Sequence, residues 1–383
     1  MPSDLSSADR GLLDSQRMEA QTEALVQARA RTLGLIDGLG DRELSRVVDP
    51  LLSPLAWDLG HIANFEQRWL LGPDDDSLDR VYDPFSQPRA IRGGLPLLQG
   101  DECFGYMDEV RSRVLAEGTA LDPFLTELVI QHELQHNETM LQLLAQLGAG
   151  MPQGVRERSA CGAAEWRSVP AGQYAIGRDP RHEGDFVYDN ERTEHIRELA
   201  AFEIASTPVT VAEYMQWIED GGYRRPEWWS REGLEWLDES RARAPLGWRA
   251  AEDGYADVTF GEIRELDPDA PVCHVNWFEA EAYARSHDAR LPDEFEWEAA
   301  ARSGVVEATG EVWEWTASEF DAYPGFEPFC YREYSQPFFA KGYRVLRGGS
   351  AVTHPRTVDE RFRNWDLPVR RQIFSGIRLA RSL

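Results

Sequence analysis

Paired cysteines, excess basic charge and long apolar runs are all missing from this sequence of 383 residues. Its four cysteines are scattered and form no C-x-x-C pair, which favours a reducing cytoplasm over a disulfide framework. A formal net charge of −27 argues against nonspecific binding to nucleic acid or anionic membranes. No apolar run reaches the roughly 18 residues of a membrane-spanning helix, and the first residues lack the basic and apolar regions of a signal peptide. We therefore expect a soluble, cytoplasmic protein.

The length and a change of texture near the middle of the sequence indicate two domains. Up to residue 147 the sequence is typical of long amphipathic helices. Beyond a glycine-rich stretch at residues 148–154, short alternating segments, aromatics and Gly/Pro turns take over. We expect an α+β protein, with a helical bundle in residues 1–155 and a loop-rich mixed domain in residues 156–383.

Four helices are expected in the first domain, joined by short or medium connections. They cover residues 16–38, 55–71, 101–117 and 123–147, with a loop over residues 72–100. Such helices form an antiparallel bundle, and bundle cores commonly hold metal sites built from facing helices. In the second domain, a helix is expected over residues 277–286.

Two histidines, His132 and His136, lie four residues apart in the last of these helices. Side chains at i and i+4 share one helix face, so both imidazoles can point at one metal ion. The alternative is a solvated helix face that carries two histidines. His61 lies on the apolar face of the helix at residues 55–71; alone it would be an ordinary core residue, but beside His132 and His136 it is a natural third ligand.

The other polar residues near these histidines are expected to play surface roles. Glu133, Asn137 and Glu138 should lie on the outside of the helix and help solubility or helix pairing.

Arg89 and Arg92 stand three apart in the loop over residues 72–100 of an otherwise acidic chain. They are either solvated surface arginines or a clamp for carboxylates, which guanidinium binds through two parallel hydrogen bonds.

Several segments resemble known families. In the second half, residues 168–177 (SVPAGQYAIG), 290–300 (RLPDEFEWEAA) and 310–316 (GEVWEWT) resemble the formylglycine-generating-enzyme-like (sulfatase-modifying factor) domain, a variant of the C-type lectin-like fold. The first half resembles DinB-like four-helix bundles. The fusion of the two is similar, over nearly the whole chain, to the ergothioneine-type sulfoxide synthases of the EgtB family. The most specific match is FRNWDLPVRRQIFSG at residues 362–376, which resembles the substrate-binding loop of that family.

The resemblance implies that His61, His132 and His136 are iron ligands. Three neutral imidazoles could equally hold zinc, and the carboxylate of the two-histidine, one-carboxylate iron sites is missing. Iron is therefore an implication of the resemblance, with O2 as co-substrate. Structural calcium, known in related domains, is doubtful because the segment at residues 303–309 is short.

The resemblance also assigns the substrate-binding residues. Those for γ-glutamylcysteine are Arg89, Arg92, Asp366 and Arg370. This set suits a substrate with two carboxylates and one ammonium group. Those for hercynine (Nα-trimethylhistidine) are Gln135, Asn364 and Trp365, since an amide can bind imidazole or carboxylate and an aromatic face can receive a quaternary ammonium. Trp365 could instead be an aromatic residue that only holds the fold together, and Arg371 is expected to be structural.

A tyrosine is the expected proton donor, and Tyr331 matches the active-site tyrosine of the family best. Tyr323 and Tyr334 are nearby alternatives. The resemblance thus implies a monomeric iron(II)- and O2-dependent sulfoxide synthase that joins γ-glutamylcysteine to C2 of hercynine. A selenoneine synthase or a cysteine-using variant remains open, although the arginine set favours γ-glutamylcysteine. A further alternative is a non-catalytic lectin-like binding module on a zinc-stabilised bundle.

Overall fold

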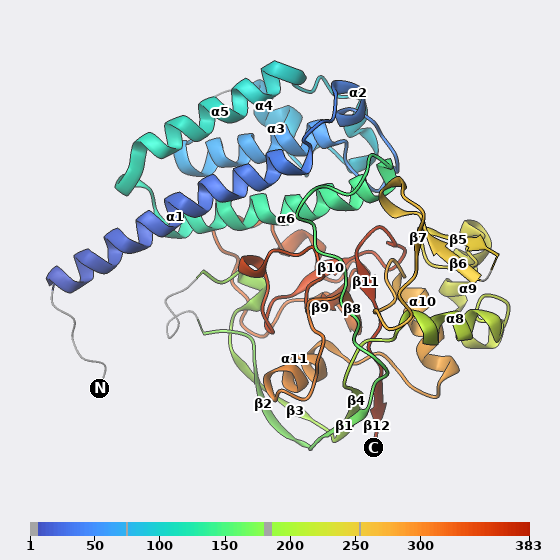
Figure 1. The fold of residues 1–383 in the computed structure, drawn as a ribbon. Helices are drawn as coiled ribbons and strands as arrows, with labels where there is room; N and C mark the ends of the chain where they lie inside the picture. Colours follow the sequence, from blue (N-terminus) through green and yellow to red (C-terminus); the bar gives the residue numbers. More distant parts are fainter. Residues whose placement is uncertain (1–6, 74–75, 180–185, 253) are drawn as a thin grey trace. The chain divides into compact units, whose positions relative to one another are not determined.

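The computed structural model describes residues 7–73, 76–179, 186–252 and 254–383. The chain divides into two compact units, Met1–Gly154 and Val155–Leu383 (Figure 1). Among the helices of the described residues, none combines the length and apolarity needed to cross a membrane.

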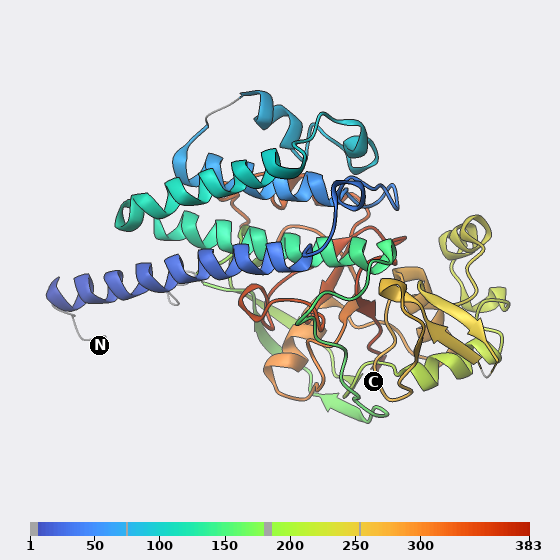
Figure 2. The same cartoon turned by 45° about the horizontal axis from the view of Figure 1, so that its top comes forward.

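Four long helices build the first unit, as predicted: α1 (Ser7–Leu35), α3 (Leu55–Glu66), α5 (Gly100–Glu117) and α6 (Pro123–Leu147). Helix α6 packs on α1 and α3, and α3 also packs on α5 (Figure 2). The start of α6 is fixed by Asp122, whose side chain accepts hydrogen bonds from the N–H groups of Phe124 and Leu125. Gly148 ends the helix in the left-handed conformation, at a φ of 74°.

The predicted loop over residues 72–100 was wrong in part. It contains a two-turn helix, α4 (Asp76–Tyr82), and a 3-10 helix, Arg89–Gly94. Helix α3 also continues beyond Glu66 as a five-residue π-helix, Gln67–Leu71, and a single-turn helix, α2 (Asp41–Leu44), precedes α3. The π-helix lies within the helix predicted over residues 55–71. Helices as short as α2, α4 and the 3-10 helix have too few turns to show a repeating apolar face, so their sequences carry no helical pattern.

The prediction that Glu133, Asn137 and Glu138 lie on the outside of α6 was also wrong. Their exposed fractions are 1%, 1% and 9%. Glu133 binds two arginines from other helices, and Asn137 donates a hydrogen bond to Thr32 Oγ1 at 2.8 Å. Partners distant in sequence thus compensate for the burial of Glu133 and of the Asn137 amide nitrogen.

Four small sheets and short helices make up the described part of the second unit. The largest sheet has the strand order β10-β9-β8-β11, with β8 and β11 parallel and the other pairs antiparallel. A second sheet has the order β1-β4-β12. The strands are β1 (Trp166–Val169), β2 (Gly172–Ile176), β3 (His195–Leu199), β4 (Phe202–Ala205), β5 (Trp248–Ala251), β6 (Gly254–Asp257), β7 (Arg264–Glu265), β8 (Trp313–Glu319), β9 (Arg344–Arg347), β10 (Asn364–Asp366), β11 (Ser375–Gly376) and β12 (Ala380–Ser382).

The helices of this unit are α8 (Val211–Glu219), α9 (Arg231–Ser240), α10 (Trp277–Ser286) and α11 (Glu294–Arg302). Helix α10 spans the residues predicted for it. Buried ion pairs tie the sheets and loops to α11: Arg347 on β9 contacts Glu298 at 2.6 Å, and Arg363, just before β10, contacts Glu294 at 2.6 Å. The predicted α+β class, with a helical first half and a sheet-containing second half, is confirmed.

Candidate metal centre and substrate-binding residues

The three predicted metal ligands meet inside the first unit. His61 on α3 and His132 and His136 on α6 bring one ring nitrogen each to within 4.8 Å of one another. The Nε2 atoms of His61 and His132 are 3.1 Å apart. The i, i+4 spacing on α6 places its two histidines on the face that packs against α3, so the histidines converge as the sequence predicts.

Outer contacts fix the orientation of two of these rings. The Nδ1 atom of His61 lies 2.7 Å from the backbone oxygen of Tyr82, and the Nδ1 atom of His136 lies 3.0 Å from Asp58 Oδ1. Because both partners are acceptors, each Nδ1 carries the proton. Nε2 is therefore the nitrogen of each ring that is left to face a metal, as in many histidine ligands.

Aromatic side chains enclose the other sides of the site. Trp57 stacks on His61 at 4.5 Å between ring centroids, and Phe65 stacks on His132 at 3.6 Å. Burial, reinforced by the neighbouring His136, lowers the pKa of His61 and of His132 well below the ordinary value. Both rings are thus neutral at pH 7, which is the form that binds metal.

The donor set fits a divalent first-row metal. Three converging imidazoles, two of them oriented by outer contacts, can hold such an ion and leave positions for further ligands. Within the described chain, no carboxylate joins the three nitrogens. Asp58 is 1% exposed, and its second oxygen, Oδ2, finds no hydrogen-bond partner among the described residues.

The two predicted clamp arginines have different environments. Arg89 is exposed, whereas Arg92 is buried and lies over the Trp57 ring at 3.5 Å. The Arg92 guanidinium donates to Ser53 Oγ and to two backbone oxygens, those of Pro84 and Gln87. Its contacts brace the connection between α4 and α5. Gln135, between the two ligand histidines of α6, is half-buried.

The second unit holds the remaining predicted substrate residues. Asn364, Trp365 and Asp366 form β10, and Asp366 Oδ2 lies 3.6 Å from Arg370 Nη1. Trp365 stacks on Phe320 at 4.1 Å and meets Tyr334 edge-on at 5.3 Å. One ring face is therefore already used in packing, in line with the alternative that Trp365 holds the fold together.

The three candidate tyrosines differ in burial and in their contacts. Tyr323 is buried, donates its hydroxyl hydrogen to Glu294 and has a pKa raised well above the ordinary value by burial, so its position is structural. Tyr334 stacks on Tyr188 at 4.1 Å. Tyr331 is half-buried, with its ring 6.1 Å from that of Tyr334. As expected, Arg371 is structural: it forms an ion pair with the buried Glu279 at 2.8 Å.

Sequence reasoning missed Asp58 and Tyr82 as supports of the site. Asp58 precedes His61 by three residues and so lies on the same face of α3, which is a signal that was available. Tyr82 gave none, because it reaches His61 through its backbone oxygen.

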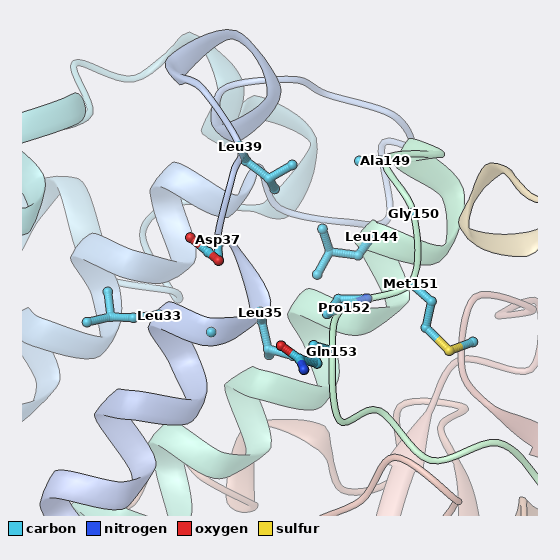
Figure 3. A pocket seen from close by; sticks show the side chains of 11 residues that line it. Leu33, Leu35, Asp37, Leu39, Leu144, Ala149, Gly150, Met151, Pro152 and Gln153 are labelled. Carbon is cyan, nitrogen blue, oxygen red and sulfur yellow. The ribbon is translucent and has the colours of Figure 1, made fainter.

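A cavity of ≈ 600 Å³ also lies in the first unit, between the last turns of α1 and residues 149–153 (Figure 3). Polar and apolar atoms both line it, and Asp37 is the one charged residue among its lining residues. None of the predicted site residues lines it.

Comparison with known proteins agrees with this architecture. Residues 24–146 match the DinB superfamily, and residues 155–309 and 303–383 match the sulfatase-modifying factor enzyme 1-like domain. The molecule is thus a fusion of these two domain classes, as the sequence predicted.

Similar proteins of known name identify the family to which this two-domain chain belongs. The hercynine oxygenase of Mycolicibacterium smegmatis is 39% identical over 428 residues, covering 94% of this chain and 98% of the relative. That of Mycobacterium tuberculosis is 39% identical and covers 93% of this chain and 97% of the relative. A formylglycine-generating enzyme of Streptomyces coelicolor is 32% identical over only 36% of this chain. The chain belongs to the hercynine oxygenase family and is an enzyme of the oxidoreductase class.

Proposed function

We propose that this protein is an iron(II)- and O2-dependent sulfoxide synthase that joins γ-glutamylcysteine to C2 of the hercynine imidazole. The observation that carries the proposal is a preformed three-histidine site in a chain that is 39% identical to hercynine oxygenases over nearly its whole length. In this proposal residues 1–155 supply the metal site and residues 156–383 supply substrate-binding loops.

Iron(II), held by His61, His132 and His136, would supply the redox chemistry by which O2 couples sulfur to carbon. The protein's own contribution is to keep His61 and His132 neutral and to orient the rings of His61 and His136. Tyr82 and Asp58 hold two Nδ1 protons, and Trp57 and Phe65 exclude water from the ring faces. Stoichiometric zinc that iron cannot replace would instead support a zinc-stabilised binding module.

Charge complementarity guides the assignment of γ-glutamylcysteine. In a chain of net charge −27, arginines are needed to bind a substrate with two carboxylates. Arg89, Arg92 and Arg370 would meet the carboxylates, and Asp366 would meet the ammonium group. Arg92 would do so while bracing the segment that carries Arg89. A selenosugar offers no carboxylate to such a set.

Hercynine carries an imidazole, a carboxylate and a trimethylammonium group. Gln135 and Asn364 would hydrogen-bond the first two. The aromatic ring of Trp365 would receive the third.

Product analysis tests the function directly. Iron-loaded protein is incubated in air with hercynine and, in turn, γ-glutamylcysteine, cysteine or a selenosugar, and products are identified by mass. We expect the hercynyl-γ-glutamylcysteine sulfoxide. A selenium adduct without any sulfoxide would select the selenoneine alternative, and the absence of every adduct would refute the proposal.

The proton-donor role of Tyr331 has its own test. Tyr331→Phe removes the phenolic proton and should shift product from C–S coupling toward cysteine sulfinate, because the coupling step loses its acid. Tyr334→Phe is the matched control, since Tyr334 is held by stacking on Tyr188. Equal product ratios in the wild type and Tyr331→Phe would mean that the tyrosine is misassigned.

A further inference from the structure

Four charged side chains close a ring in the core of the first unit. Each comes from a different helix: Arg29 from α1, Glu66 from α3, Arg111 from α5 and Glu133 from α6. Their exposed fractions are 5%, 0%, 6% and 1%. The ring carries two positive and two negative charges, so it adds no net charge to the core.

Each arginine in the ring bridges both carboxylates. Arg29 contacts Glu66 at 2.8 Å through Nη2 and Glu133 at 2.8 Å through Nε. Arg111 contacts Glu66 at 2.5 Å through Nε and Glu133 at 2.7 Å through Nη2. Thr32 adds a hydrogen bond to Glu133 Oε1 at 2.7 Å. A guanidinium suits this task because its donors point in fixed, separate directions.

Stability alone does not account for this arrangement. Moving ions out of water is expensive, and well-packed apolar residues of similar volume often serve stability as well or better. The best-attested use of buried polar groups is to select one alignment of helices among several.

The two carboxylates of the ring lie on the helices that carry the three histidines. Glu66 follows His61 by five residues on α3, and Glu133 directly follows His132 on α6. A slip of α6 by one residue would move its side chains about 1.5 Å along the helix axis and rotate them about 100°. Such a slip would break both arginine bridges and separate His61 Nε2 from His132 Nε2, now 3.1 Å apart.

We propose that Arg29, Glu66, Arg111 and Glu133 are positioning residues that set the alignment of α3 against α6 and thereby the geometry of the three-histidine metal site. The inference rests on the proposed function only for the statement that these histidines bind a divalent metal. None of the four residues needs to touch metal or substrate.

The main test replaces the ring with apolar residues of similar size, in the full chain. The variant Arg29→Met/Glu66→Leu/Arg111→Met/Glu133→Leu should unfold at the same temperature as the wild type or higher. Its Kd for Co²⁺, used as a spectroscopic probe, should rise at least about tenfold, the loss typical when supports of metal ligands are removed. Its visible Co²⁺ absorption should change in position or broaden.

A conservative variant keeps the proposal testable if the fourfold variant does not fold. Arg29→Lys retains the charge but cannot reach both carboxylates in the same way, so the Kd for Co²⁺ should rise severalfold. Arg347→Lys is the matched control: Arg347 is also fully buried and paired, with Glu298 at 2.6 Å, but belongs to the second unit. It should leave the Kd and the spectrum as in the wild type.

A folded fourfold variant with wild-type Kd and spectrum would overturn the proposal. If only the lysine variants fold, equal Kd values and spectra for Arg29→Lys and Arg347→Lys would overturn it. The two proposals fail separately, because this experiment measures metal binding. A wild-type chain that binds Co²⁺ with the expected dependence on the ring but forms no sulfoxide would refute the proposed function and leave the ring's role standing.

Discussion

Replacing Asp58 with asparagine probes the outer support of the metal site at a single atom. The wild-type carboxylate accepts the His136 Nδ1 hydrogen at 3.0 Å from a position that is 1% exposed. Asparagine has nearly the same volume, so no cavity forms. Its neutral amide, however, replaces a charge-assisted hydrogen bond with a weaker one. It also puts an N–H2 group where Asp58 Oδ2 now finds no partner among the described residues, or turns that group toward His136.

The expected loss follows from these changes. Losing such a support typically weakens metal binding 10- to 100-fold, which corresponds to about 1.4–2.7 kcal/mol at 25 °C. We expect Asp58→Asn to fall in this range and Asp58→Ala toward its upper end, because alanine leaves the Nδ1 hydrogen without any acceptor at that position.

Competition between the protein and a chelator for Co²⁺ measures the change. Asp79→Asn is the control. Asp79 lies on α4 and accepts a hydrogen bond at 2.7 Å from Asn64, which is on the same helix as Asp58; among the described residues it does not contact the three histidines. It should bind Co²⁺ like the wild type. Equal affinities for wild type and Asp58→Asn, with both folded, would refute the view that the carboxylate tunes His136.

Two further predictions concern stability. Gly60→Ala would place a Cβ 2.1 Å from Tyr82 Cζ. The Tyr82 ring must then move, and with it the Tyr82 backbone oxygen that contacts His61. Overpacking of this kind lowers the free energy of unfolding by roughly 1–3 kcal/mol. Thermal unfolding should show a lower Tm, whereas Gly105→Ala on α5, whose added Cβ meets nothing within 4 Å, should show no loss. Burial raises the pKa of Glu191 to about 7 from an ordinary 4.5, so the folded state binds this proton more tightly than the unfolded state does. As the pH rises from 4.5 to 7, the folded state therefore loses up to about 3 kcal/mol of stability from this group. In urea unfolding at pH 4 and pH 8, Glu191→Gln should lack this decline, and an identical pH dependence in both proteins would contradict the assignment.

Long periodic segments were predictable from the sequence. Helices α1, α5 and α6 show amphipathic patterns over four or more turns, and the predicted and observed helices overlap closely for α5 and α6. The shared helix face of His132 and His136 was predictable to the same extent, because their i, i+4 spacing is a local property of one helix.

Partners distant in sequence were not predictable. Nothing near Glu133 indicates that Arg29, 104 residues earlier, meets it in the core, so a charged side chain was taken for a surface one. Arg92 likewise could be a clamp or a surface residue from sequence alone. Its contacts with Ser53 and with backbone oxygens depend on how the α4–α5 connection folds back on itself.

The strand order β1-β4-β12 has a consequence for biosynthesis. The sheet joins residues 166–169 to residues 380–382 through β4, so it cannot close until nearly the entire second unit has left the ribosome. The four long helices of the first unit, with all three histidines, are complete by residue 147. During synthesis the first unit can therefore fold, and bring its three histidines together, while the second unit is still an open chain with unpaired strands. Slow translation or a shortage of chaperones would then show first as aggregation through the second unit.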